Sequence, residues 1–317
     1  MIERFLQKYR KGQTGIWMGL SADELADAPF PEQMFHSGGE VPKADINVLW
    51  ARWFVRSLFV ASAPVKVAEI VREIGRYIDA RHAAISQARK ELLRQQLFDL
   101  VSDEMARERN QGRKAVSVRD RELLLELAGT PCRCALCGYK FSQEAIDRFV
   151  DQAAVSIPLP LYVDFVRPSG LFEEDLRIEI DHKYPVSKGG GHLDNLQLLC
   201  GWCNGAKRDY TNIYECGVTA VPFFHPRRGL VEVPQPFWIV RKLVASRACE
   251  HSGADACEET SATCELRIAS IFGGAMTPPN LAVYCEKHDP LRSERLVLPR
   301  DYRDGKSKAK KRVSNRT

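Results

Sequence analysis

Two pairs of cysteines are the residues whose types and spacing point most directly to chemistry. Cys134 is separated from Cys137 by two residues, and Cys200 from Cys203 by two residues. Each such turn can direct both of its sulfurs at one ion, and four sulfurs are typical of tetrahedral structural zinc. Because the first residues are charged rather than apolar, we expect no secretion signal and a cytoplasmic location, where disulfides are disfavoured. The spacing therefore predicts a structural zinc site.

Between the two pairs lie polar residues at the places where a hairpin would present them. A strand over Leu176–Ile180 delivers Asp181 and His182 at its end, and a glycine-rich loop follows. Asn195 begins a return strand that runs into the second cysteine pair, and Asn204 comes directly after that pair, where a helix is expected. The order strand, loop, strand and helix is thus predicted around these polar side chains.

This stretch resembles a known enzyme motif. The residues IEIDHKYPVSKGGGHLDNLQLLCGWCNGAK are similar to the HNH endonuclease motif, with Asp-His on the first strand, Asn on the second, and Cys-Asn opening the helix. The resemblance extends from Cys134 to Arg208, about a quarter of the chain. It implies a ββα-metal finger with a four-cysteine zinc site, and it implies hydrolysis of phosphodiester bonds.

The resemblance also implies a role for each polar residue. His182 would be the general base, since histidine changes its protonation near neutral pH. Asp181 and Asn204 would hold one divalent ion, and oxygen ligands suit a hard ion such as Mg²⁺ or Mn²⁺. Asn195 would orient His182 through backbone contacts across the hairpin.

A second copy of the pattern follows the first. The segments LRIEI and NLQLLC-x2-C of the first copy are matched by LRIAS and NLAVYC-x2-H between Leu266 and His288. Ala269 and Ser270 stand where the Asp-His pair stood, and Asp289 stands in place of the helix-opening Asn. The repeat predicts a degenerate HNH-like or treble-clef module that lacks the catalytic base.

The second module has its own set of candidate zinc ligands. Cys285 and His288 form one half of the set, and the other half comes from Cys249, Cys257 and Cys264. Cys249 and Cys257 are favoured because both precede the strand, as the first cysteine pair does in the first module. Scattered core cysteines are the alternative, because neither spacing is that of a tight turn.

The region before the first cysteine pair has the apolar periodicity of helices. Three helices are expected, starting near Asp45, Pro64 and Ala83. Trp50 and Trp53 lie on the apolar stripe of the first helix, so we expect them in a hydrophobic core rather than on a base-stacking surface. No motif in this region indicates its role.

The sequence thus predicts an α+β protein of four parts. These are a helical N-terminal domain (1–120), an HNH nuclease domain (121–215), a second, inactive zinc-binding HNH-like module (216–300) and a basic disordered tail (301–317). No apolar run approaches the ~20 residues that a membrane helix needs, so no membrane contact is expected.

The basic residues are distributed unevenly. The chain has a net charge of +5, and residues 301–317 alone, with seven Lys or Arg and two Asp, account for it. Such a tail can make nonspecific phosphate contacts or remain a solvated end. Lys207 and Arg208, just beyond Asn204, are further candidates for phosphate contacts, with a solvent-exposed role as the alternative.

Together these features predict a metal-dependent endonuclease acting on DNA, with one or two structural Zn²⁺ ions and a catalytic Mg²⁺ or Mn²⁺. The alternative is a zinc-based nucleic-acid-binding or assembly subunit with a vestigial nuclease site. The resemblance suggests restriction, phage defence or a mobile element as the setting, without choosing among them. A homodimer, or a partner protein bound through the N-terminal helices, is left open.

Overall fold

The computed structural model describes most of the chain. The described residues are 3, 6, 30, 32–58, 66–109, 116–151, 154–183, 196–208, 210–253 and 256–314, with the side chains of 103–109 and 313 excepted. Within these ranges, no helix combines the length and the apolar character that crossing a membrane requires.

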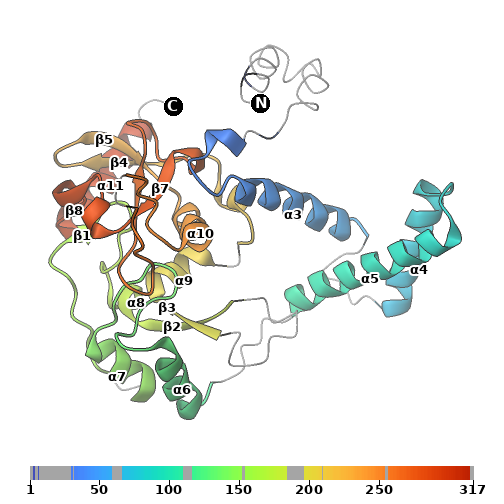
Figure 1. The fold of residues 1–317 in the computed structure, drawn as a ribbon, viewed down its shortest axis with the longest axis horizontal. Coiled ribbons are helices and arrows are strands. Elements are labelled where there is room, and N and C mark those ends of the chain that lie inside the picture. Colours follow the sequence, from blue (N-terminus) through green and yellow to red (C-terminus); the bar gives the residue numbers. More distant parts are fainter. Residues whose placement is uncertain are drawn as a thin grey trace. The chain divides into compact units, whose positions relative to one another are not determined.

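The chain divides into two compact units, whose elements are labelled in Figure 1. The larger unit is made of Met1–Asp45, Ala128–Glu179 and Leu198–Thr317. The smaller unit is made of Ile46–Leu127 and Ile180–Gln197. The unit boundaries do not coincide with the predicted domain boundaries, because the N-terminal segment and the hairpin of the first module each contribute to both units.

The smaller unit is mainly helical. Its helices are α3 (Glu40–Arg56, which starts in the larger unit), α4 (Val67–Arg81), α5 (Gln87–Arg109) and α6 (Val118–Ala128, whose last residue belongs to the larger unit). Ile70, Ile74 and Ile78 lie one turn apart on α4 and pack against Val55 and Val101. The expected helical region is confirmed, although its three helices start a few residues away from the predicted positions.

The expectation that Trp50 and Trp53 are core residues is wrong. Their side chains are 62% and 53% exposed, and the two rings contact each other edge to face, with centroids 5.1 Å apart. The residues that pack into the core here are instead Phe54 and Val55 of α3 and Leu58 in the turn just after it. The apolar stripe of the sequence is wider than the face that α3 buries. Periodicity alone therefore could not separate the apolar side chains that become buried from those that stay exposed.

The first module follows the predicted order of elements. Strands β2 (Ile178–His182) and β3 (Leu196–Cys200) form a two-stranded sheet, and helix α9 (Gly201–Lys207) starts directly after β3. Gly201 permits this start, since a Cβ there would lie 1.7 Å from the Glu174 carbonyl oxygen of α8 (Glu173–Leu176). Helix α7 (Gln143–Asp151) lies between the first cysteine pair and β2 in the chain.

The second module has the predicted hairpin but a shorter third element. Strands β6 (Arg267–Ser270) and β7 (Leu281–Tyr284) pair antiparallel, with Ser270 opposite Leu281. A three-residue 3-10 helix, η6 (Glu286–His288), follows where the first module has α9. Pro290 lies two residues beyond η6, and proline disfavours a helical conformation in the residue before it. The predicted ββα-like repeat is therefore truncated at its helix.

The larger unit contains further elements. They are η1 (Glu32–Met34), η4 (Ile213–Cys216), the hairpin of β4 (Val221–His225) and β5 (Gly229–Val233), α10 (Pro236–Ser246), η5 (Pro278–Asn280), η7 (Arg292–Glu294), and the paired strands β1 (Val163–Asp164) and β8 (Leu296–Val297).

The prediction of a disordered tail from residue 301 is wrong for the residues that the structure describes there. Residues Pro299–Ser314 form helix α11, which packs on β4. Tyr302, Gly305 and Ala309 are buried on one side of this helix. A Cβ at Gly305 would lie 2.5 Å from the Phe224 carbonyl oxygen, so the absence of a side chain allows the close approach. The many charges hide this short apolar stripe in the sequence.

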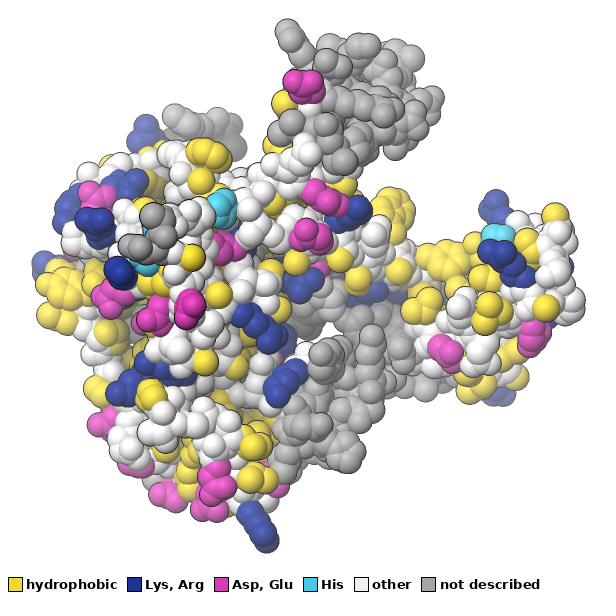
Figure 2. Space-filling view, in the orientation of Figure 1, with side chains coloured by type: hydrophobic (Ala, Val, Ile, Leu, Met, Phe, Trp, Pro, Cys, Tyr) yellow, Lys and Arg dark blue, Asp and Glu magenta, His cyan; other side chains and the backbone are white. Residues whose placement is uncertain are grey.

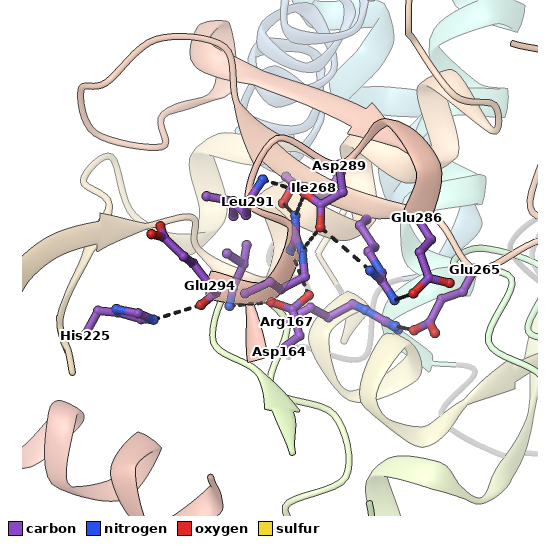
Figure 3. A network of polar contacts seen from close by, with 12 residues as sticks. Asp164, Arg167, His225, Glu265, Ile268, Glu286, Asp289, Leu291 and Glu294 are labelled. Atoms are coloured by element: carbon purple, nitrogen blue, oxygen red, sulfur yellow. Dashed lines mark hydrogen bonds and ion pairs between the residues drawn. The ribbon is translucent and has the colours of Figure 1, made fainter. Parts of the chain in front are cut away.

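Arg295 joins the two modules through a buried polar network, in which its partners Asp164, Ile268 and Asp289 are labelled in Figure 3. Its guanidinium donates two hydrogen bonds to Asp289 (2.6 and 2.8 Å), one to Asp164 (2.8 Å) and one to the carbonyl oxygen of Ile268 (2.8 Å). Asp164 lies on β1, before the first hairpin, whereas Asp289 and Ile268 belong to the second module. Burial by itself lowers the pKa of Arg295, but the two carboxylates outweigh burial and raise this pKa above its usual value.

We expect Arg295→Met to lower the free energy of unfolding by about 3–5 kcal/mol, because the substitution removes the cation that pairs with the carboxylates of Asp164 and Asp289 and leaves Asp289 only its longer ion pair with Arg267, at 3.7 Å. Urea unfolding of the zinc-loaded protein measures this change. Arg228→Ala is the matched control, since Arg228 and its partner Glu294 are both solvent-exposed at 38% and 47%, and it should cost less than about 1 kcal/mol. Equal losses in the two variants would contradict the structural role given to Arg295.

Candidate active site and metal centres

The two cysteine pairs of the first module converge on one point. The sulfurs of Cys134, Cys137, Cys200 and Cys203 all lie within 4.8 Å of one another, and all four residues are buried. Cys137 Sγ and Cys200 Sγ are 3.8 Å apart. A tetrahedron with zinc–sulfur distances of about 2.3 Å has edges of about 3.8 Å, so the spacing fits a zinc ion.

The environment of Arg167 suits anionic sulfurs at this centre. The side chain is buried and forms an ion pair with Glu265, while its Nε and Nη1 atoms have no hydrogen-bond partner among the described residues. Burial by itself lowers the pKa of Arg167, but Cys137, Glu265 and the neighbouring cysteines outweigh burial and raise this pKa well above its usual value. Unsatisfied cationic donors beside four sulfurs suit a zinc tetrathiolate, whose net charge is negative.

A second group of possible ligands lies in the degenerate module. The ligand atoms of Cys249, Cys257, Cys285 and His288 also lie within 4.8 Å of one another. The Sγ atoms of Cys257 and Cys285 are 3.8 Å apart, and His288 Nδ1 is 3.4 Å from Cys285 Sγ and 3.7 Å from Cys249 Sγ. These spacings fit tetrahedral coordination by three sulfurs and one nitrogen. The structure thus brings together the favoured ligand set, without Cys264.

Residues beside the second group connect the two centres. The carbonyl oxygen of Cys137 accepts a hydrogen bond from the Leu266 backbone N–H at 2.8 Å. A Cβ at Gly138 would lie 1.9 Å from the Cys264 carbonyl oxygen, so the first cysteine turn and the second module are in direct backbone contact. The ring of His251 stacks on His288 with centroids 3.9 Å apart. The two centres therefore share one packed framework.

Asp181 and His182 occupy the end of β2, as predicted. The Asp181 carboxylate accepts a hydrogen bond from Gln197 Nε2 at 2.7 Å, and Gln197 lies on the paired strand β3. Both residues belong to the smaller unit. Asn195, the third predicted residue of the hairpin, lies outside the described residues, so its role stays a prediction.

Asn204 lies on α9 in the larger unit and is held by a residue that the sequence did not single out. Its Nδ2 atom donates to Glu179 Oε2 at 3.4 Å. Glu179 precedes Asp181 by two residues on β2, and side chains two apart share a face of a strand. The alternation along the strand was therefore a usable signal for Glu179, whose carboxylate also pairs with Arg177.

Lys207 and Arg208 lie at the end of α9 and not near its start, because this helix has only seven residues. Arg208 caps it with a positive φ of 48°, and its guanidinium carbon is 6.0 Å from the centre of the Tyr210 ring. Their part in phosphate binding stays a prediction.

Comparison with known proteins supports the resemblance stated above. Residues 170–209 match the family model described as HNH endonuclease, and these residues contain β2, β3 and α9. No match was found among curated proteins, nor among solved structures. The HNH resemblance is thus confirmed over this segment, whereas the other parts of the chain have no counterpart in these comparisons.

We expect two zinc ions per chain after purification without chelator, measured by inductively coupled plasma mass spectrometry. Cys134→Ser and Cys285→Ser should each lower the content to one, because each removes one ligand of a four-ligand set. Cys216→Ser is the control that should retain both ions, since Cys216 belongs to neither set. A single zinc ion that disappears in Cys134→Ser would mean that the second group does not bind zinc.

Proposed function

We propose that the protein is a metal-dependent endonuclease that hydrolyses phosphodiester bonds in DNA. The observation that carries this proposal is the HNH match over residues 170–209, in which the Asp-His pair at the end of β2 and the Asn on α9 are all retained. The second module lacks the Asp-His pair, so the presence of this pair in the first module favours a working catalytic site there. Restriction or phage defence is the setting that the family resemblance suggests.

In the proposed mechanism, His182 takes a proton from the attacking water as general base. Asp181 and Asn204 would hold a Mg²⁺ or Mn²⁺ ion, which when bound stabilises negative charge on the phosphate and on the leaving oxygen. Asn195 would keep the His182 ring in position. Lys207 and Arg208 would contact phosphates of the substrate.

The neighbours of the two oxygen ligands support this assignment. Gln197 donates to one oxygen of Asp181, which restrains the carboxylate. Glu179 accepts from the amide nitrogen of Asn204, so the amide oxygen is directed away from Glu179. An asparagine can turn either end of its amide toward a site, and only the oxygen can bind a cation. We therefore propose Glu179 as a positioning residue.

Plasmid nicking in the presence of Mg²⁺ or Mn²⁺ tests the proposed activity. We expect the zinc-loaded wild-type protein to convert supercoiled DNA to nicked or linear forms. His182→Ala should reduce the rate by at least about 10²-fold, since general-base catalysis contributes about 10²–10⁴-fold. Activity that survives in His182→Ala would exclude this mechanism. An inactive wild-type protein with intact zinc content would favour the alternative, a zinc-based nucleic-acid-binding or assembly subunit with a vestigial site.

Binding of Mn²⁺, followed by electron paramagnetic resonance in the absence of DNA, tests the role of Glu179. We expect Glu179→Leu to weaken Mn²⁺ binding by about 10–100-fold, because the Asn204 amide loses the group that orients it. In an Asn204→Asp background the same substitution should not weaken binding, since a carboxylate offers oxygen at both ends. Unchanged Mn²⁺ affinity in Glu179→Leu alone would show that Glu179 does not position the amide.

A further inference from the structure

Helix α11 carries a concentration of positive charge that the proposed catalytic residues do not use. Its sixteen residues include two acids, Asp301 and Asp304, and seven cations: Arg300, Arg303, Lys306, Lys308, Lys310, Lys311 and Arg312. The net charge of this one helix is therefore +5, equal to that of the whole chain. The helix is docked on β4, so these charges are presented from a fixed position.

The docking of α11 places all seven cations on its solvent-facing side. Tyr302, Gly305 and Ala309 are spaced three and four residues apart and are buried, whereas each of the seven cations is exposed. Lys306 Nζ lies 5.8 Å from the centre of the Tyr302 ring, and Lys308 Nζ lies 5.9 Å from that of Phe224. Dark-blue side chains are frequent over this part of the surface in Figure 2, at the edge where Figure 1 labels α11 and β5.

The charge pattern along α11 is unfavourable for the isolated protein. From Lys306 to Arg312 there are five cations and no acid, and two like-charged pairs are four residues apart. Each such pair costs about 0.2–0.5 kcal/mol in a helix. Cations in the last turn stabilise the helix through its dipole, but this effect decays within one turn and does not extend to Lys306 and Lys308. An external anion would relieve the repulsion.

The packing of α11 also indicates which kind of anion fits. A helix that binds a lipid surface inserts an apolar face into the membrane, whereas the apolar stripe of α11 is covered by β4. The exposed face offers only charge and flexible side chains over a helix length of about 24 Å. A duplex, with one phosphate charge per about 1.7 Å of its axis, offers enough anions over that length to pair with these exposed cations.

We propose that α11 is a nonspecific DNA-backbone-binding helix, whose lysines and arginines neutralise phosphates of duplex DNA. The choice of DNA rests on the proposed nuclease function, whereas the phosphate contacts rest on the charge and exposure of α11 itself. The helix holds the duplex through its backbone and adds no sequence discrimination. Its contribution to binding falls steeply as salt concentration rises.

Salt-dependent binding to a fluorescein-labelled 30-base-pair duplex tests this proposal. Fluorescence anisotropy is recorded between 50 and 200 mM salt with zinc-loaded protein and without Mg²⁺ or Mn²⁺, so that no cleavage occurs. The test variant carries Lys308→Gln, Lys310→Gln and Lys311→Gln together. We expect the slope of log Kobs against log[salt] to become shallower by about 2.7, since each neutralised phosphate contributes about 0.9.

The matched control places Arg at the same three positions, which retains every charge and should retain the wild-type slope. Circular dichroism establishes that both triple variants keep the wild-type helix content. The decrease in the salt-dependence slope of the Gln variant should be the same on duplexes of unrelated sequence. An unchanged slope in the Gln variant overturns the proposal, and so does stronger binding of wild-type protein to anionic phospholipid vesicles than to DNA.

The outcomes separate this proposal from the proposed nuclease function. If wild-type protein nicks plasmid but the Gln variant keeps its slope, α11 does not bind the duplex and the nuclease function stands. If the Gln variant has a shallower slope but no preparation nicks DNA, then α11 binds DNA and the proposed nuclease function is contradicted. Absence of any DNA binding by wild-type protein overturns both.

Discussion

The charge interaction of Arg167 with the first sulfur cluster and with Glu265 is the one on which the larger unit depends most. Four sulfurs in a dry interior cannot all be anionic without nearby positive charge, because isolated buried charges are very unfavourable. A zinc ion supplies part of that charge, and Arg167 supplies more from the side of the cluster. The other end of the same guanidinium pairs with Glu265, which precedes β6 of the second module. Neutralisation of the first centre is thereby coupled to the position of the second.

The two modules use corresponding positions in different ways. In the first, the residue after the last cysteine is Asn204, a neutral amide with one end held by Glu179. In the second, the residue after the last ligand is Asp289, whose two oxygens both accept from Arg295. A carboxylate engaged in this way inside the protein has no oxygen left for a catalytic ion. The second module has therefore exchanged a candidate ion ligand for a structural ion pair, in keeping with the loss of the Asp-His pair from β6.

Spacing in the sequence predicted those features that short-range geometry determines. The C-x2-C and C-x2-H turns and the start of α9 follow from residues a few positions apart. The union of two such turns around one ion, as for Cys137 and Cys200 at a separation of 63 residues, was instead predicted from ligand chemistry and the motif, and the family match supports the first hairpin. The residues that sequence reasoning missed are Arg167, Glu179 and Gln197, whose importance comes from partners brought close by folding. The exposed Trp50 and Trp53 belong to the same category, because an apolar stripe does not reveal which part of it a neighbouring helix will cover. The tail was misjudged for a related reason: three small or aromatic residues anchor α11, and a count of charges conceals them.

The buried ion pairs also change how the overall charge should be interpreted. Arg167 and Arg295 are counted in the net charge, yet both are occupied by internal acids and sulfurs and are inaccessible to a ligand. Surface cations such as Arg228 are partly offset by neighbouring acids. The cations of α11 differ because acids are absent from the second half of that helix and its apolar side is already covered. A chain whose other residues sum to about neutral therefore presents a concentrated field at one element, and attraction of a polyanion depends on such local concentration more than on the total charge.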